Sequence, residues 1–159
     1  MKVTPFKNYT TGISVEKTVM EIEQILTRNK ATRIIKDYDE EGDITSISFG
    51  IIVTIQGRTT LMPVKLPANS EKVQQVLIQM QRSREIENRS KFRTLEHARN
   101  VAWRNIKDWL LAQMALVKAE QADIPQVFLP YAYSDKLDRT FYELVKEGKV
   151  NLPMLEGGE

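Results

Sequence analysis

The stretch that decides the fold runs from Ser46 to Leu66 and reads SISFGIIVTIQGRTTLMPVKL. Its first half alternates apolar side chains with mostly small or polar ones. The apolar positions are Ile47, Phe49, Ile51, Val53 and Ile55. A period of two residues predicts a β-strand with one buried face and one mostly polar face.

The second half of this stretch predicts a returning strand. Gln56-Gly57-Arg58 has the composition of a tight turn, and the chain returns over Thr59 to Leu66. Pro63 has no N–H to donate to a neighbouring strand, so this strand is expected at an edge of the sheet. A β-prone run from Thr32 to Tyr38 precedes the turn cluster Asp39–Asp43. Together these segments predict a three-stranded antiparallel meander.

Helices are predicted on both sides of this meander in the sequence. One covers about 14–29, with Ser14 as its N-cap and an apolar residue at every third or fourth position. Pro67-Ala68-Asn69-Ser70 ends the strand and caps a second helix, whose apolar face is made of Val73, Val76, Leu77 and Met80. The third is capped by Thr94, runs to about Gln121 without Gly or Pro, and carries a wide apolar arc that indicates burial on several sides.

The remaining sequence predicts short elements and sets the domain organisation. Asp123 begins a short helix, 130–135 is expected to be a loop, and Thr140–Glu147 suits a last helix that stops at Gly148. The predicted fold class is α+β, a small antiparallel sheet packed with helices, one of them long. The predicted organisation is a flexible arm over 1–13, a single domain over 14–150 and a flexible tail over 151–159.

Composition excludes several classes of function. The chain has 159 residues, of which 42% are hydrophobic and 28% charged, as in ordinary globular proteins. It has no cysteine and one histidine, so thiol chemistry and zinc-thiolate sites are excluded. No Gly-rich phosphate loop is present. No stretch reaches the ~18 apolar residues of a membrane span, and the N-terminus lacks the apolar core expected of a secretory signal.

The charge is unevenly distributed. The formal net charge is only +2, but residues 82–107 hold eight basic and three acidic side chains. Residues 108–159 hold five basic and nine acidic side chains. A concentrated basic segment in a nearly neutral protein indicates a localised anionic partner.

The candidate site lies in this basic segment. Five polar residues on the long helix follow spacings of four, three, four and three, which places them on one stripe: Arg93, His97, Asn100, Arg104 and Lys107. Four more cations lie just upstream, at Arg82, Arg84, Arg89 and Lys91. Basic side chains grip phosphates, and Phe92 among them could stack on a base. The pattern predicts a nucleic-acid interface. Two alternatives stay open, a solvated helix face with Phe92 in the core, and a protein partner with an acidic surface.

Other constellations are weaker candidates for chemistry. His97 could act as a general base only with a nucleophile or an orienting carboxylate, which the sequence does not place. The acidic run that begins at Asp37 has the spacing of a calcium loop, but Ser48 stands where a bidentate Glu is needed. We therefore expect no metal, no cofactor and no catalysis, with a metal-dependent nuclease as the enzymatic alternative. Trp103 and Trp109 are expected in the core.

Several segments of the chain also look familiar. They are Val15-Glu16-Lys17-Thr18-Val19, Glu21-Ile22-Glu23, the run from Val101 to Trp109, and Phe128-Leu129-Pro130-Tyr131. In these the chain resembles a family of small uncharacterised phage and prophage proteins, over about 14–145. The resemblance brings no established activity and no functional residues. It implies a viral accessory protein made in the cytoplasm of a host bacterium, of the kind that serves phage DNA replication or recombination or blocks host defences.

The function predicted from these observations is a non-catalytic phage-type accessory protein that binds nucleic acid through the basic helix stripe. The alternative is a protein-binding inhibitor or adaptor, such as an anti-defence factor, with a host protein as its partner. The wide apolar arc of the long helix would also suit a homodimer. No membrane association is expected.

Overall fold

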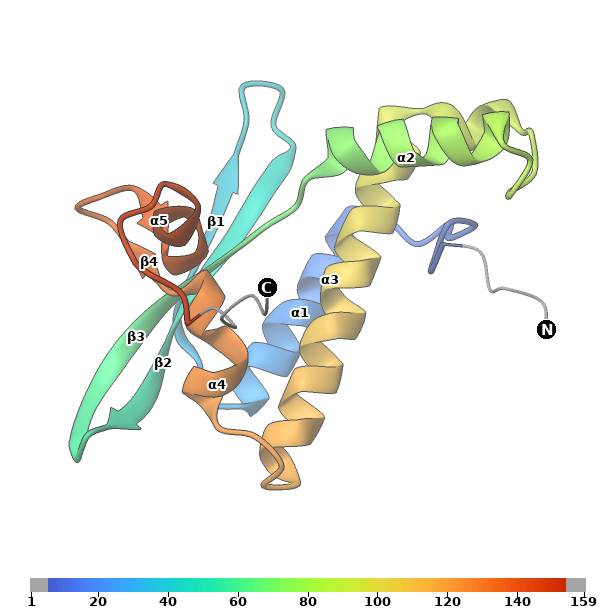
Figure 1. The fold of residues 1–159 in the computed structure, drawn as a ribbon. Helices are drawn as coiled ribbons and strands as arrows, with labels where there is room; N and C mark the ends of the chain where they lie inside the picture. Colours follow the sequence, from blue (N-terminus) through green and yellow to red (C-terminus); the bar gives the residue numbers. More distant parts are fainter. Residues whose placement is uncertain (1–5, 154–159) are drawn as a thin grey trace.

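β2 (Ile44–Ile55) lies in the middle of a three-stranded antiparallel sheet, between β1 (Thr32–Tyr38) and β3 (Arg58–Pro67), in this computed structural model (Figure 1). The structure describes residues 6–153. In the register, Phe49 faces Val64 across the two strands. The predicted α+β class, the meander and the edge position of the strand with Pro63 are confirmed.

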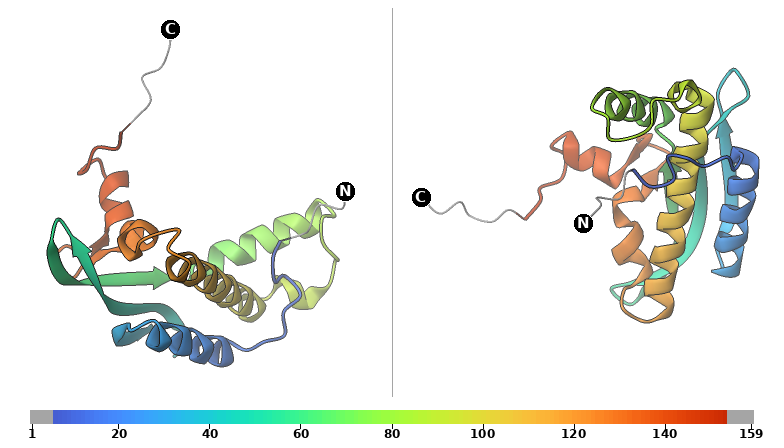
Figure 2. Two further views of the ribbon diagram at one scale, coloured as in Figure 1. Left: turned by 90° about the horizontal axis from the view of Figure 1, so that it is seen from below. Right: turned by 90° about the vertical axis from the view of Figure 1, so that its right-hand side faces the viewer.

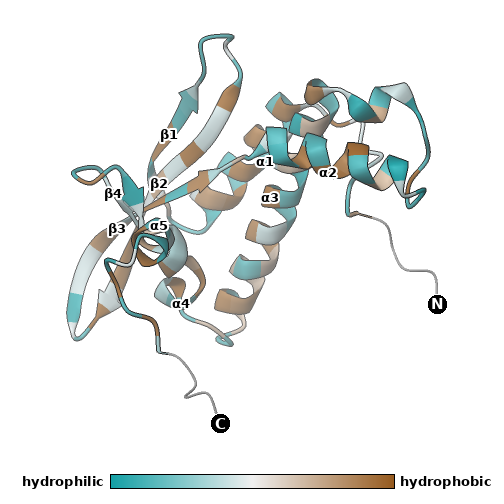
Figure 3. Cartoon of the chain, turned by 45° about the horizontal axis from the view of Figure 1, so that its top comes forward, coloured by the Kyte–Doolittle hydropathy of each residue, from teal (hydrophilic) through white to brown (hydrophobic). Residues whose placement is uncertain are grey.

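One face of the sheet forms the core. Its buried side chains alternate with exposed ones, as hydrophobic and hydrophilic bands do along the strands in Figure 3. α1 (Val15–Arg28) and α3 (Leu95–Lys118) lie on this side of the sheet (Figure 2). The core cluster joins Phe49 and Val64 of the sheet to Trp103 of α3. Trp103 is fully buried as predicted, and Trp109 is half-buried at the edge of the same cluster.

The other face of the sheet is largely uncovered. Ile35 and Ile52 lie there with 57% and 63% of their surface exposed. Gly50 belongs to the same face, and a Cβ at this position would come within 2.9 Å of Leu61 Cδ2. The missing side chain therefore lets Leu61 lie flat against the strand.

α2 (Ser70–Arg82) packs on α3, away from the sheet. Between them lies a second apolar cluster, made of Leu77, Ile86, Ala98 and Val101. Val76, predicted on the buried face, is instead 40% exposed. Because α2 rests on one helix and not on a sheet, only a narrow stripe of its surface is covered.

α3 is buried on several sides by its own chain. α1, α2 and the sheet cover the arc that carries Ala98, Trp103, Leu110 and Met114. Leu111 and Leu116, near the C-terminal end of α3, are exposed. A homodimer stays a prediction. Within the described range, no helix is both long and apolar enough to cross a membrane.

The segment 6–13 lies against α3, although the sequence predicted a flexible arm over 1–13; residues 1–5 of that arm lie outside the described residues. Phe6 and Tyr9 pack against the second apolar cluster. The Asn8 side-chain amide donates to Asn105 Oδ1 at 2.8 Å and to Asp108 Oδ2 at 2.9 Å. The polar side chains of α3 therefore hold this segment. Of the predicted tail, 151–153 is exposed and 154–159 lies outside the described residues.

The C-terminal part adds a small sheet that the sequence did not predict. After α4 (Ile124–Phe128) and a 3-10 turn η2 (Leu129–Tyr131), β4 (Tyr133–Ser134) pairs with β5 (Arg139–Thr140), and α5 (Phe141–Lys146) follows. The predicted loop over 130–135 is therefore wrong for 130–131, which belong to η2, and for 133–134, which form β4. These strands have two residues each, which is too short for a recognisable period. Ala132 bridges to Val64 and so joins this part to the edge of β3.

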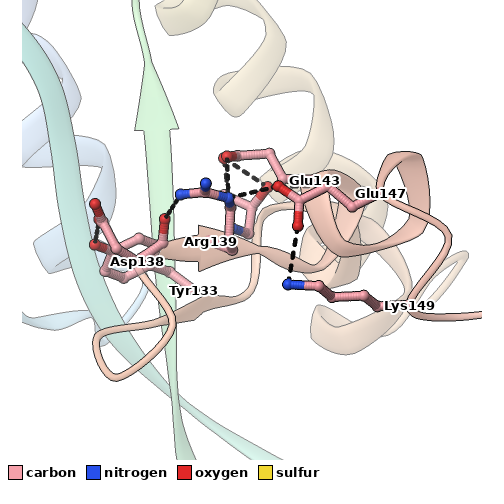
Figure 4. A network of polar contacts seen from close by, with 7 residues as sticks. Tyr133, Asp138, Arg139, Glu143, Glu147 and Lys149 are labelled. Carbon is pink, nitrogen blue, oxygen red and sulfur yellow. Dashed lines mark hydrogen bonds and ion pairs between the residues drawn. The ribbon is translucent and has the colours of Figure 1, made fainter.

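Polar contacts fix this small sheet to α5 (Figure 4). Arg139 Nε lies 2.6 Å from Glu147 Oε1, and Lys149 pairs with the same carboxylate at 3.2 Å. The Tyr133 hydroxyl donates to Asp138, and this hydrogen bond raises the pKa of Tyr133 to about 12. The network is exposed and lies far along the chain from the basic segment.

Candidate nucleic-acid interface

Four members of the predicted stripe, His97, Asn100, Arg104 and Lys107, share a face of α3, and its two cations on this helix are engaged inside the molecule. Arg93 was predicted on the same helix, but it precedes the N-cap Thr94 and lies in a separate 3-10 turn. Arg104 Nη1 donates to Glu21 Oε2 on α1 at 2.5 Å, and its side chain is only 15% exposed. Lys107 lies 3.4 Å from Asp108, with its side chain 16% exposed. Neither cation is exposed enough to bind a phosphate. The prediction that Arg104 and Lys107 contact nucleic acid is therefore corrected.

Asp108 is the centre of this engaged region. It accepts from Asn8 and lies 3.1 Å from Lys7 Nζ. Burial alone would raise the pKa of Asp108, but the hydrogen bonds from Asn8 and Lys7 and the charge of Lys107 outweigh it and lower that pKa below its ordinary value. The acidic side chain that follows the stripe thus neutralises part of it.

The middle of the stripe is covered by the segment 6–13. His97 Nε2 lies 2.5 Å from the Tyr9 carbonyl oxygen. Phe92 is 2% exposed, and its ring packs edge-on against Tyr9 and beside His97. Phe92 has no face on which a base could stack. Phe92 therefore lies in the core, as in the alternative of a solvated helix face, although Arg104 and Lys107 on that face are not solvated. Asn100 is half-buried and lines a cleft that α3 forms with α1 and the β1–β2 hairpin.

The upstream cations are exposed. We call residues 82–93 the basic loop; it holds five basic and two acidic side chains. All five cations are exposed, namely Arg82, Arg84, Arg89, Lys91 and Arg93. Arg89 pairs with Glu87 at 2.8 Å, and the other four make no ion pair with any residue that the structure describes. Of the predicted site, this part remains available to an anion.

The basic loop is held in one conformation by side chains from α2. Gln81 is buried, and its Nε2 donates to the carbonyl oxygens of Glu87 at 3.1 Å and Arg89 at 2.8 Å. Gln74 Nε2 donates to the Arg93 carbonyl oxygen at 2.8 Å. Sequence reasoning missed both glutamines, since a polar residue in an amphipathic helix gives no signal of which loop it will bond.

Two apolar anchors and a backbone turn complete the basic loop. Ile86 is buried in the second apolar cluster, and Phe92 is buried in the 3-10 turn η1 (Ser90–Arg93). At the end of α2, Arg84 adopts a positive φ of 59°, and Glu85 N–H bonds back to the Met80 carbonyl at 2.9 Å. This arrangement is a Schellman-type helix ending, usually made with Gly. The loop is thus ordered at both ends and in its middle.

A cleft lined by acidic side chains, in contrast to the basic loop, lies between α1, the β1–β2 hairpin and the start of α3. Its volume is about 560 Å³, and its acids are Glu16, Glu23, Asp43 and Glu96. Two of the acids are neutralised, since Lys36 pairs with Glu23 at 2.8 Å and Arg99 with Asp43 at 3.0 Å. The hydrogen bond to Glu23 raises the pKa of Lys36. The acidic lining does not suit a polyanion.

Metal binding finds no support in the geometry. Within residues 6–153, no group of three or more His, Asp or Glu side chains lies close enough to hold a metal ion. The acidic cleft therefore offers charge but no ligand set.

No protein-family model, curated protein or solved structure matches this chain. The resemblance to phage and prophage proteins stays a prediction.

Proposed function

We propose that the protein binds nucleic acid, with the basic loop contacting the phosphate backbone. The observation that carries this proposal is the set of five exposed cations on residues 82–93, four of them without an ion-pair partner among the described residues. Arg and Lys are the side chains that grip phosphate oxygens. None of these five cations lines the acidic cleft.

The order of the loop supports binding. Gln81 and Gln74 hold the backbone near Arg89 and Arg93, so the cations start close to one arrangement. A pre-ordered loop loses less conformational entropy when it binds. Each phosphate contact releases condensed counterions, so affinity should fall steeply as salt rises.

The setting that we propose follows the resemblance of residues 14–145 to phage proteins. The protein would act without catalysis, as a phage-type accessory protein for nucleic-acid replication or recombination. Its place would be the cytoplasm of the host bacterium.

The second candidate function is a protein-binding inhibitor or adaptor. It is favoured by the uncovered face of the sheet, where Ile35 and Ile52 are more than half exposed. Apolar side chains gathered on an open surface are typical of protein interfaces. A complex with one host protein that survives both nuclease treatment and high salt would support this candidate over the first.

The experiment that tests the first proposal removes three cations of the basic loop. The variant is Arg84→Ala/Arg89→Ala/Lys91→Ala, and binding to a labelled duplex of about two helical turns, ~20 base pairs, is measured by fluorescence anisotropy over a range of salt. We expect weaker binding, and a salt dependence whose slope falls by about 0.9 for each phosphate contact removed.

A matched control removes three exposed cations far from the basic loop. The variant Arg28→Ala/Lys30→Ala/Arg58→Ala has the same change of net charge, and none of the three forms an ion pair with a described residue. It should bind nearly as the unmodified protein does. Equal effects of the two triple variants would show that net charge alone matters and would refute the basic loop as the binding site.

A further inference from the structure

The helix α2 protrudes from the part of the molecule that contains the sheet. α2 packs against α3 and η1, and its axis runs away from the sheet toward the far end of the structure (Figure 1, Figure 2). It has 13 residues, and is therefore about 20 Å long. Its C-terminal end leads directly into the basic loop. A protruding helix beside a group of cations is placed to enter a groove while the cations meet the groove's edges.

The glutamines of α2 divide into two pairs with different roles. Gln74 and Gln81 point inward and bond to the carbonyl oxygens of the basic loop. Gln75 and Gln79 are exposed, and their side chains make no hydrogen bond within the described part of the chain. The inward pair explains the order of the loop, whereas no hydrogen bond to a described residue accounts for the outward pair.

The outward glutamines belong to one polar face. Four exposed residues of α2 follow spacings of three, four and three, which places them on one side of the helix: Lys72, Gln75, Gln79 and Arg82. The exposed Val76 lies next to this face and is its apolar member. The face thus combines two cations, two amides and a branched alkyl group, and the exposed Glu71, four residues before Gln75, adjoins it.

This set of groups matches the edges of base pairs in the major groove. A Gln side chain can bond adenine N6 and N7 together, Arg can bond guanine O6 and N7, and an alkyl group contacts the thymine methyl. The groove of B-form DNA is about 12 Å wide and admits an α-helix. A-form RNA has a deep, narrow major groove that side chains do not read. Single strands are bound by exposed stacking aromatics, and the aromatic residue of the basic loop, Phe92, is buried.

We propose that α2 lies in the major groove of duplex DNA, where Gln75 and Gln79 contact base edges while the basic loop holds the flanking phosphates. This inference rests on the proposed function, since it needs the protein to bind nucleic acid. It adds a substrate class, duplex DNA, and a preference for sequence. Lys72 and Arg82, at the two ends of the face, are placed near the groove walls.

The test is selection from short duplexes with a randomised centre, carried out with the unmodified protein and with Gln75→Ala/Gln79→Ala. We expect the unmodified protein to enrich a defined sequence, with roughly tenfold or greater discrimination at the contacted positions. The double variant should lose that enrichment. Its affinity for unselected duplex and its salt slope should be unchanged, because the basic loop is intact.

The control Gln24→Ala/Gln121→Ala changes two exposed glutamines outside α2 and should keep the enrichment. Salt-dependent binding without any enriched sequence would overturn the role of α2 and leave the proposed function standing. Enrichment that survives in the Gln75→Ala/Gln79→Ala variant would also overturn it. If no duplex binds even at low salt, the inference and the proposed function both fail.

Discussion

Arg104 on α3 donates a 2.5 Å hydrogen bond to Glu21 on α1, across 83 positions of sequence. This ion pair links the two helices that cover the sheet. It also removes from solvent a cation that the helix periodicity had assigned to an anionic ligand. Lys107, one turn further, lies 3.4 Å from its sequence neighbour Asp108 and is also mostly buried. Of the predicted site, the cations that stay exposed therefore lie upstream, in the basic loop.

Replacement of Arg104 by Ala should act on stability and not on nucleic-acid binding. The ion pair is partly buried, so we expect a loss of about 1–2 kcal/mol in the free energy of unfolding, between the values for exposed and buried pairs. Urea denaturation of Arg104→Ala, Glu21→Ala and the double variant measures it. The two single losses should not add. A stability loss in the double variant equal to the sum of the two single losses would contradict this assignment. A marked loss of DNA affinity in folded Arg104→Ala would also contradict it.

Phe92 should behave as a core residue. Phe92→Leu removes part of a buried ring, and we expect it to lower the free energy of unfolding by about 1–2 kcal/mol. Binding to a duplex and to a single strand, measured well below the unfolding transition, should be unchanged. A stacking role would give the opposite result: full stability, and affinity for the single strand reduced by roughly 1–3 kcal/mol.

Gln81 should control the order of the basic loop. Gln81→Leu keeps the size of the side chain but leaves the carbonyl oxygens of Glu87 and Arg89 without their donor. We expect about 1–2 kcal/mol lower stability and faster hydrogen exchange in the segment 83–93. The exposed Gln79→Leu is the matched control and should leave exchange in that segment unchanged. Equal exchange in both variants would argue that the loop is ordered by its apolar anchors alone.

Acid should weaken the contact between the segment 6–13 and α3. The pKa of Asp108 is lowered in the folded protein from its ordinary value of 3.8. Its contribution to stability is therefore complete above that ordinary value, and is lost as the pH falls through the lower folded value. We expect this contribution to be about 1 kcal/mol, because it arises from hydrogen bonds to a partly exposed carboxylate.

Asp108→Asn isolates this contribution. Free energies of unfolding measured from neutral pH to below the ordinary pKa of a carboxyl should fall more steeply for the unmodified protein than for the variant. Identical pH dependence in the two proteins would show that Asp108 is not coupled to folding.

The sheet and the main helices were predictable because local pattern decides them. The period of two over Ser46–Leu66 and the proline at position 63 determine the strand faces and the edge strand. Ser14 and Thr94 cap their helices as predicted, each accepting a hydrogen bond from a backbone N–H in the first turn. Such signals lie within a few residues of the element they define.

The candidate site was predictable only in part, because contacts between residues far apart in the sequence decide which of its side chains are exposed. The exposed cations of the basic loop are visible as charge, whereas the engagement of Arg104 depends on Glu21, which lies far away in sequence. The cover over His97 comes from Tyr9, at a separation of 88 positions. Helix periodicity tells which residues share a face, and packing decides what lies on that face.

The most direct measurement is fluorescence anisotropy of a labelled duplex titrated with the unmodified protein at about 50 and 200 mM salt, a range over which several phosphate contacts change affinity by orders of magnitude. The account predicts micromolar or tighter binding at the lower salt that weakens sharply at the higher salt. Absence of binding at the lower salt would contradict the claim that the basic loop is a nucleic-acid interface.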